Sequence, residues 1–339
     1  MYRAEGNPET AKLVIIAESP AREEMRLGRP LVGPSGSIFQ GALERAGILR
    51  QDCYITNVFG FMTTKNKGGD IIGRHDEVLW TSKGFTYDGR AIADKMIEEE
   101  LSKCKANLFL TLGATATMAL CGDHRNQILK IRGSIYPAAS APIFGRKVLA
   151  TLHPAAILHG QPNWRYMFDW DFKRAARELK FPEIVKQPHN FSTSPTTDAA
   201  IEWLESARQR FAGKFLAVDI ELQNCQVVCI GFGIDGTTAF CVDFYERSEE
   251  SEARLWKALA ELLEDPNVGK IFQNGMFDIS FLLSQCDILV RGRIHDTMIA
   301  HHIMYPDLPK SMAFMQSIYT NEPYHKDMVK HGGIEKGDG

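Results

Sequence analysis

The chain lacks the features that mark exported and membrane proteins. No uninterrupted apolar run approaches the roughly 20 residues of a membrane span. The N-terminus, MYRAEGNPET, also lacks the apolar core of a signal peptide. These absences argue against a membrane partner and predict a protein that stays in the compartment where it is made, the cytoplasm.

Cysteines are few and scattered. The seven cysteines form no CxxC pair and no Cys/His cluster at the spacing of a zinc site. An odd, scattered set in a chain without an export signal indicates reduced and mostly buried thiols. The sequence therefore points to neither a disulfide framework nor a structural metal.

An excess of positive charge is also missing. Lys and Arg number 39 against 42 Asp and Glu, a formal net charge of −3. Overall attraction therefore does not predict a polyanionic partner, and any nucleic-acid contact has to come from local patches. The candidate patches are Arg22, Arg26 and Arg29, and Lys65 with Lys67. A solvated surface explains each of them equally well.

The chain does contain enough apolar sequence for two cores. It has 339 residues, of which 44% are hydrophobic and 24% charged, as in globular proteins. Between Phe181 and Asp198, prolines, serines and threonines replace the hydrophobic periodicity. We therefore expect one domain over residues 1–182, a linker over 183–197 and a second domain over 198–339.

Strands and helices alternate in the first domain. The expected strands are Leu13–Ala17, Cys53–Asn57, Leu108–Leu112 and Lys147–Leu152. Repeated strand–helix steps predict an α/β fold of three layers, a parallel sheet with helices on both faces. The segment Val58–Arg90, rich in Gly, Lys and Thr, is expected to be an active-site or binding loop.

A polar or turn-forming residue stands at the end of each expected strand: Asn57 is the last residue of its strand, and Glu18, Gly113 and His153 each follow theirs. Carboxyl ends of parallel strands meet at the edge where α/β folds place their ligands. We therefore expect these residues to converge on one ligand site. Taken singly, each also fits a structural role, since Asn57 can cap a turn and His153 can be a hydrogen-bonded loop histidine.

Six blocks within Leu13–Leu158 carry a specific resemblance. In order they are AESP, GRPLVGPSG, YITN, LTLGATAT, IRGSIYP and TLHPAAIL. They resemble the motifs of the uracil-DNA glycosylase superfamily, above all the family 4 branch, with GEAPG, GRPFVGxAG, YITN, LGA, RG and HPxxLL. The resemblance implies a domain that flips a pyrimidine out of DNA and hydrolyses its N-glycosidic bond.

Two catalytic roles follow from the resemblance. Glu18 matches the acid that orients water or stabilises the developing sugar cation, and His153 matches the histidine that hydrogen-bonds uracil O2. The chemistry suits these residue types, because the base leaves as an anion from an oxocarbenium-like sugar. A carboxylate near C1′ and a donor at O2 then stabilise opposite charges.

The remaining matches concern the base. Asn57 matches the asparagine that binds uracil O4 and N3, and Ser19 and Pro20 follow the acid within the same motif. Leu31 stands where the family has a phenylalanine that stacks on uracil, a contact worth roughly 1–3 kcal/mol. The motif AESPA also lacks the two flanking glycines, and the four iron–sulfur cysteines are absent. We expect no iron–sulfur cluster and no other cofactor in this domain.

Acidic residues dominate the motifs of the second half. Asp219 and Glu221 flank one residue of an expected strand, so both face the same side. Asn274 and Asp278 bracket the start of an expected helix, and HDT follows at His295. Carboxylates gathered from a strand and a helix suit divalent cations, as in phosphodiester hydrolysis.

This half resembles the 3′–5′ exonuclease domain of phage-like family-A DNA polymerases, a ribonuclease H-like α/β fold. DIE matches the first exonuclease motif and QNGMFD the second. The resemblance implies that Asp219, Glu221 and Asp278 bind Mg²⁺ or Mn²⁺. The third motif, Tyr-x-x-x-Asp, is missing, since Pro323 stands four positions before Asp327. We therefore expect an incomplete domain with little exonuclease activity, in a fragment or split piece of a longer polymerase-like protein.

Together the two halves predict a DNA-processing protein that joins a glycosylase-like module to a proofreading module. Single-stranded or template DNA is the favoured partner, because flipping costs least there. A polymerase domain or subunit continuing after Gly339 is a further expected partner, in the host cytoplasm if the protein is phage-encoded. The alternative is a non-catalytic module that binds uracil or a modified base ahead of a phage polymerase.

Overall fold

The computed structural model describes residues 3–65, 67, 69–81, 83–122, 127–160 and 162–322. The chain divides into two compact units, each with its contacts mostly within itself. The second unit is Lys186–Met312, and the first contains the residues up to Val185 together with those from Ala313 on. The predicted second domain, 198–339, differs from this division because the described residues after Met312 group with the first unit. The region of the missing third motif, around Asp327, lies outside the described residues.

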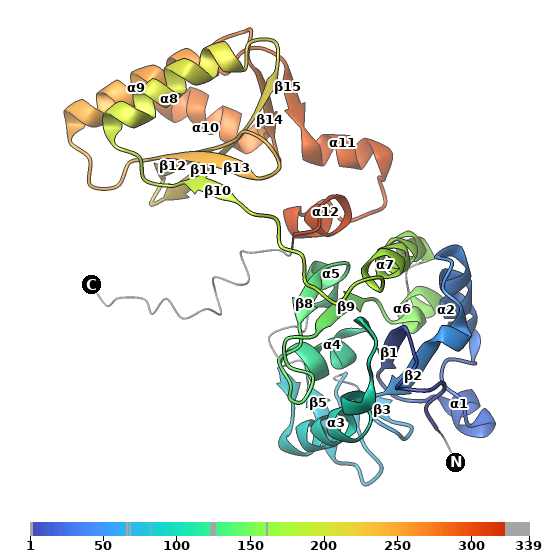
Figure 1. Ribbon diagram of the computed structural model, residues 1–339. Helices are drawn as coiled ribbons and strands as arrows, with labels where there is room; N and C mark the ends of the chain where they lie inside the picture. The colour runs from blue at the N-terminus through green and yellow to red at the C-terminus, as the bar shows by residue number, and fades with distance from the viewer. Residues whose placement is uncertain are drawn as a thin grey trace. The chain divides into compact units, whose positions relative to one another are not determined.

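The first unit is built on a five-stranded sheet of order β2-β1-β7-β9-β8 (Figure 1). The first four strands are parallel, and β8 runs antiparallel at the edge. The strands are β1 Leu13–Ala17, β2 Cys53–Asn57, β7 Leu108–Leu112, β8 Ile135–Pro137 and β9 Lys147–Thr151. Every residue of the four parallel strands is buried, as expected for a sheet covered on both faces.

Two groups of helices cover this sheet. Val14 and Ile16 share a core with α3 and α4, whereas Leu13 faces α7 on the other side. Within this second layer the rings of Phe39 in α2 and Phe172 in α7 pack edge to face, with 5.8 Å between their centroids. The helices are α1 Arg22–Leu27, α2 Pro34–Arg45, α3 Tyr87–Glu99, α4 Ala114–Cys121, α5 Ile128–Ile131, α6 Pro154–His159 and α7 Arg165–Glu178. The unit is the three-layer α/β fold that the sequence predicted.

The segment Val58–Arg90, predicted to be an active-site or binding loop, contains regular structure. It contains a four-stranded antiparallel sheet, the insert sheet, and the first turn of α3. Its strands are β3 Thr64–Lys65, β4 Ile71–Ile72, β5 Val78–Thr81 and β6 Gly84–Phe85. Ile71 and Leu79 are fully buried in the core beside α3 and α4. Strands of two to four residues are too short to show alternation, so the pattern could not reveal them.

The second unit holds a six-stranded sheet of order β10-β13-β12-β11-β14-β15 (Figure 1). An antiparallel meander, β11 to β13, is followed by parallel β14 and β15, the ribonuclease H-like arrangement. The elements are β10 Asn190–Ser192, α8 Thr197–Arg210, β11 Phe215–Gln223, β12 Gln226–Gly233, β13 Thr238–Asp243, α9 Glu249–Leu263, β14 Gly269–Phe272, α10 Met276–Cys286, β15 Ile294–Asp296 and α11 Thr297–Met304. Strand β10 comes from the predicted linker.

A buried ion pair joins distant segments of the first unit. Arg132 and Asp171 are each 1% exposed and form a bidentate ion pair, in which Arg132 Nε lies 2.8 Å from Asp171 Oδ2. Thr151 at the end of β9 donates to the same carboxylate at 2.6 Å. Arg132 also donates to Ser317 of α12, Met312–Tyr319, at 3.0 Å. The pair therefore connects β9, α7 and α12.

Two sequence expectations concern absent features. In the part of the chain that the structure describes, no helix is long and apolar enough to cross a membrane. The seven cysteines lie within the described ranges and all are free thiols, three of them buried.

Replacing Asp171 by Ala is expected to destabilise the first unit by roughly 3–5 kcal/mol, because Arg132 is left buried without its counter-charge. Urea unfolding of the full chain, followed by tryptophan fluorescence, measures this loss. Glu99→Ala is the control, since Glu99 is 63% exposed in its ion pair and should change stability by less than about 1 kcal/mol. Equal losses of stability in the two variants would contradict the stabilising role assigned to the buried Arg132–Asp171 pair.

Candidate active site

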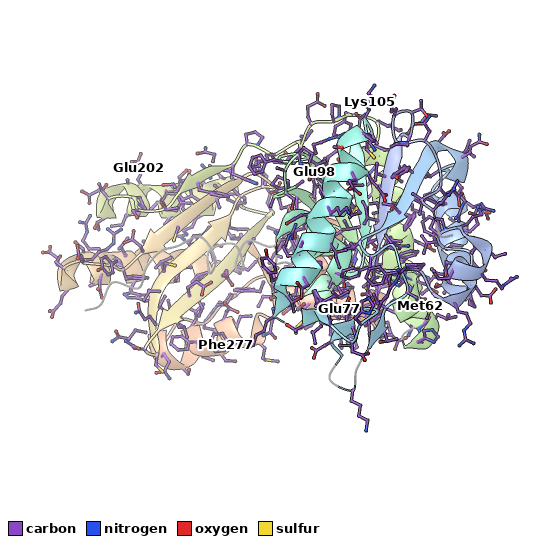
Figure 2. The ribbon with its side chains drawn as sticks, turned by 90° about the horizontal axis from the view of Figure 1, so that it is seen from below. Met62, Glu77, Glu98, Lys105, Glu202 and Phe277 are labelled. Atoms are coloured by element: carbon purple, nitrogen blue, oxygen red, sulfur yellow. The ribbon has the colours of Figure 1, made fainter. Side chains whose placement is uncertain are left out.

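The largest set of candidate residues lines one cavity of about 610 Å³ at the carboxyl edge of the first sheet. Glu18 follows β1, Gly113 follows β7 and His153 follows β9, so the parallel register brings three strand ends together. The insert sheet and the residues just before it supply another wall. Figure 2 shows Met62 of this wall and Lys105, which precedes β7, at opposite ends of the first unit. The other described residues lining the cavity are Ser19, Pro20, Ala21, Arg22, Met62, Thr63, Lys65, Trp80, Leu112, Ala114, Thr115, Ile128, Leu152, Ala155, Ala156 and Trp164.

Glu18 is held by two side chains from different elements. Thr115, in the first turn of α4, donates its hydroxyl to Glu18 Oε2 at 2.8 Å. Lys65 Nζ of β3 lies 3.6 Å from Glu18 Oε1, and the Glu18 side chain is 21% exposed. The carboxylate is thus fixed in position and remains open to the cavity. The sequence did not single out Thr115, although its place just after Gly113 at the start of a helix was the available signal.

His153 is arranged as a neutral hydrogen-bond donor. It is the N-cap of α6, and its Nδ1 accepts from the Ala155 amide at 3.2 Å. Acceptance at Nδ1 assigns the proton of the neutral ring to Nε2. Burial lowers the pKa of His153 and Lys65 lowers it further, while Glu18 raises it. The neutral ring can therefore donate from Nε2 without carrying a charge.

Glu24 of α1 holds the backbone on both sides of this helix, in the loop that follows Glu18 and at Gly33. This side chain is 4% exposed and accepts from the Ala21 amide at 3.0 Å and from the Gly33 amide at 3.4 Å. Ser19 forms a hydroxyl–hydroxyl hydrogen bond of 2.8 Å with Thr63. Ser19 and Pro20 line the cavity, and their contact with a base stays a prediction.

Leu31 does not line this cavity. Its side chain is 6% exposed, and its backbone has a φ of +48°, a conformation that favours glycine. Its carbonyl oxygen accepts from Arg50 at 3.2 Å, and Arg50 also pairs with Glu5. The geometry therefore does not place Leu31 where a base would stack in this cavity, and its stacking role stays a prediction from the motif.

Asn57 lies at the end of β2, directly opposite Ala17 in the register with β1. It is 4% exposed and borders a neighbouring hollow of about 250 Å³ with Phe61 and Glu100, not the Glu18–His153 cavity. The structure thus brings Glu18, His153, Ser19 and Pro20 together and leaves Asn57 outside the group. Its base-reading role stays a prediction.

Two tryptophans supply aromatic surface that the sequence pattern did not reveal. Trp80 of β5 and Trp164, just before α7, both line the cavity and are partly buried. The Trp80 indole N–H points at Met118 Sδ at 3.3 Å, a contact that fixes the plane of the ring. Because Trp80 lies in the insert segment that was predicted to be a loop, no periodic signal marked it as a wall of the site.

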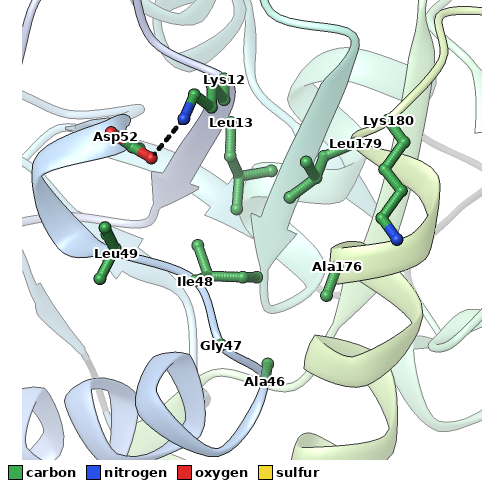
Figure 3. Close-up of a pocket in the computed structure, with 10 residues that line it drawn as sticks. All are labelled: Lys12, Leu13, Ala46, Gly47, Ile48, Leu49, Asp52, Ala176, Leu179 and Lys180. Atoms are coloured by element: carbon green, nitrogen blue, oxygen red, sulfur yellow. Dashed lines mark hydrogen bonds and ion pairs between the residues drawn. The ribbon is translucent and has the colours of Figure 1, made fainter.

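A second hollow, of about 330 Å³, lies at the opposite edge of the same sheet (Figure 3). Lys12 and Leu13 at the start of β1 border it, and Lys12 pairs with Asp52 at 2.7 Å. Ala176 and Leu179 close the other side. This is the amino end of the strands, whereas α/β folds bind their ligands at the carboxyl end. The hollow brings together no acid and histidine, and we assign it no chemistry.

The acids of the second unit lie on adjoining elements. Asp219 and Glu221 are exposed on the same face of β11, and Asp278 of α10 is 5% exposed and accepts from the Ile220 amide at 3.2 Å. Burial raises the pKa of Asp278, and the negative charges of Asp296 and Glu221 add to this against the opposing hydrogen bond from Ile220. Among the described residues, however, no three metal-binding side chains are gathered closely enough to hold an ion. As they stand, the three acids do not form a complete metal centre.

Asp296, within the HDT motif, has a structural role. Its carboxylate accepts from the Gly275 amide at 2.8 Å and caps α11 through Met298 at 2.8 Å. It therefore joins the start of α10 to the start of α11, which sets the position of Asp278 one turn further on.

Comparison with known proteins matches the two halves of the chain to two different families. Residues 4–180 match the model of the uracil DNA glycosylase superfamily, and residues 188–333 match that of a 3′–5′ exonuclease. The type-4 uracil-DNA glycosylase of Sulfurisphaera tokodaii is 30% identical over 184 residues, which are 52% of this chain and 72% of that protein. The corresponding enzyme of Thermotoga maritima is 28% identical over 159 residues, 47% of this chain and 72% of that protein.

One relative spans both halves. A DNA polymerase of Bacillus phage SP01 is 24% identical over 326 residues, which are 87% of this chain and 33% of the polymerase. The chain thus spans about a third of that relative. Among solved structures, RNase D of Escherichia coli, an exoribonuclease, covers 42% of this chain and 36% of its own, with 21% identity and a TM-score of 0.32.

In the intact chain, His153 is expected to titrate below 6.5, the ordinary value for histidine. Glu18→Gln should lower this pKa further, because it removes a negative charge that stabilises the imidazolium, and Lys65→Met should raise it, because it removes a positive charge. Nitrogen-15 NMR of the histidine rings, assigned with His153→Gln, measures these shifts. Glu23→Gln is the control and should leave the value unchanged. Shifts of opposite sign would refute this electrostatic arrangement.

Proposed function

The chain belongs to the uracil DNA glycosylase superfamily through residues 4–180, and from this premise we propose that its first unit removes uracil or a modified pyrimidine from DNA. The observation that carries the proposal is the shared cavity of Glu18 and His153, a fixed carboxylate and a neutral donor. Both protein families matched by the chain indicate hydrolases that act on nucleic acid.

In the proposed reaction the base is flipped into the cavity and the bond between C1′ and N1 breaks. The sugar then carries positive charge, which Glu18 stabilises, and the base carries negative charge at O2, which accepts from His153 Nε2. Water adds to C1′ and loses one proton, and the departing base anion takes up one proton from solvent, which completes the hydrolysis. Since flipping costs a few kcal/mol and least in single strands, single-stranded or template DNA is the proposed substrate.

The second unit supports a role beside a polymerase. We propose that Asp219, Glu221 and Asp278 are its metal-binding acids and that Mg²⁺ or Mn²⁺ is the ion, as the matched exonuclease family suggests. Two of the acids share a face of β11, and the third accepts from a β11 amide. The likeness to a phage DNA polymerase supports the further proposal that the chain acts with a polymerase domain or subunit.

A second candidate function is recognition without excision. Lys65 lies against Glu18, and Leu31 contributes no stacking surface to the cavity. Both features favour a module that binds uracil or a modified base ahead of a polymerase. The two candidates differ in one observable, the formation of an abasic site.

Single-turnover excision from a uracil-containing single strand tests the leading function. Glu18→Gln and His153→Ala are each expected to slow excision by about 10²–10³-fold, because each removes an electrostatic partner of the transition state. Glu23→Gln, an exposed neighbour outside the cavity, should have no effect. Retained DNA affinity with no abasic product from uracil or modified pyrimidines would decide for the binding module.

Trp80 is expected to supply the aromatic contact that Leu31 does not. Trp80→Ala should weaken binding of the uracil-containing strand by roughly 1–3 kcal/mol, and Trp80→Phe should recover part of this loss. Leu31→Phe should bring no gain, because the residue is buried outside the cavity. Fluorescence anisotropy with and without the target base measures the affinities. A gain from Leu31→Phe with no loss from Trp80→Ala would reverse the assignment.

A further inference from the structure

Lys65 places a primary amine inside the candidate active site. Of the described residues that line the cavity, Lys65 is the one lysine, and its Nζ lies 3.6 Å from Oε1 of Glu18. The side chain is 60% exposed, so more than half of its surface is open to solvent. Thr115 holds the other oxygen of the carboxylate, which keeps Oε1 turned toward the amine. The site therefore contains a primary amine next to a carboxylate, and this amine becomes a nucleophile once it has lost its proton.

We propose that Lys65 reacts with C1′ of an abasic deoxyribose and that the chain cleaves the strand there as a lyase. The inference rests on the proposed function in one respect, that the flipped sugar sits with C1′ beside Glu18. Any C1′ close enough to be stabilised by this carboxylate is also within reach of Nζ, because the lysine stem is long and flexible. Lysine amines form Schiff bases with carbonyl carbons in many enzymes.

The reaction balances without an oxidant or reductant. The neutral amine, having given its proton to solvent, adds to the aldehyde carbon of the ring-opened sugar. The hydroxyl of the resulting carbinolamine then takes up one proton from solvent and leaves as water, which gives an iminium. Glu18 takes a proton from C2′, and the electron pair of that C–H bond moves toward the iminium. The electrons of the resulting enamine then form the C2′=C3′ bond and restore the iminium, while the C3′–O bond breaks and its electron pair leaves with the phosphate of the downstream strand. Addition of one water to the imine releases the unsaturated sugar and restores the amine.

The residues around Lys65 make the assignment specific. Arg22 also lines the cavity, but its guanidinium remains protonated and cannot form an imine. Lys67 lies two residues further along, is exposed and does not line the cavity. An alternative role for Lys65 is purely electrostatic, as a partner of Glu18 or of a DNA phosphate. Arginine at this position keeps that role and loses the imine chemistry.

The test uses the full chain and a single-stranded oligonucleotide with one preformed abasic site. Sodium borohydride is added, which reduces an imine to a stable covalent adduct visible on a denaturing gel. The intact chain and Lys67→Ala are expected to give the adduct, and Lys65→Arg and Lys65→Ala are expected to lose it. Peptide mass spectrometry should place the sugar on Lys65.

The outcomes of this test distinguish the lyase inference from the proposed glycosylase function. An undiminished adduct in Lys65→Arg, or no adduct with the intact chain, overturns the lyase inference. Because the abasic site is made beforehand, trapping does not depend on base excision by this chain. An adduct on Lys65 without excision of uracil or of modified pyrimidines would uphold the inference and refute the glycosylase function. Circular dichroism of Lys65→Arg and Lys67→Ala confirms that both variants fold.

Discussion

The buried ion pair between Arg132 and Asp171 sets the geometry on which the first unit depends. Removing two charges from water costs several kcal/mol per ion, so such a pair persists only when its remaining hydrogen-bonding groups are satisfied. Here the carboxylate also accepts from Thr151, and the guanidinium also donates to Ser317. Thr151 is the last residue of β9 and stands two positions before His153. The pair thereby fixes the strand end that delivers the histidine, together with α7 and α12.

Much of the fold could be predicted because buried parallel strands leave a strong signal. Strands β1, β2 and β7 have the predicted bounds, since each is a short, fully buried run of mostly apolar and β-branched residues with a polar or glycine residue at or just after its end. Parallel register then carries Glu18 and His153 to one edge without any knowledge of side-chain contacts. The sequence pattern does not show which hollow a side chain borders beyond the end of its strand. Asn57 shares that edge with Glu18, yet it borders a different hollow.

The parts that escaped prediction depend on contacts between segments far apart in sequence. The insert sheet is held by Ile71 and Leu79 in the core of the first unit, while its own strands are too short to show a period. Trp80 and Lys65 enter the cavity only because that sheet folds over it. In the second unit the acidic motifs predicted a strand and a helix but not the spacing of their carboxylates. That spacing depends on how Asp296 ties α10 to α11.

Gly113 shows how residues from motifs that are far apart in the sequence come to line one pocket. Its amide donates to the carbonyl of Thr151 at 2.8 Å, and its φ is +91°, which side chains rarely tolerate. A Cβ at this position would lie 3.1 Å from Cβ of His153. Glycine thus allows the start of α4 to approach the histidine, and the same turn aims Thr115 at Glu18. The acid, the histidine and the hydroxyl that positions the acid are brought together by one residue without a side chain.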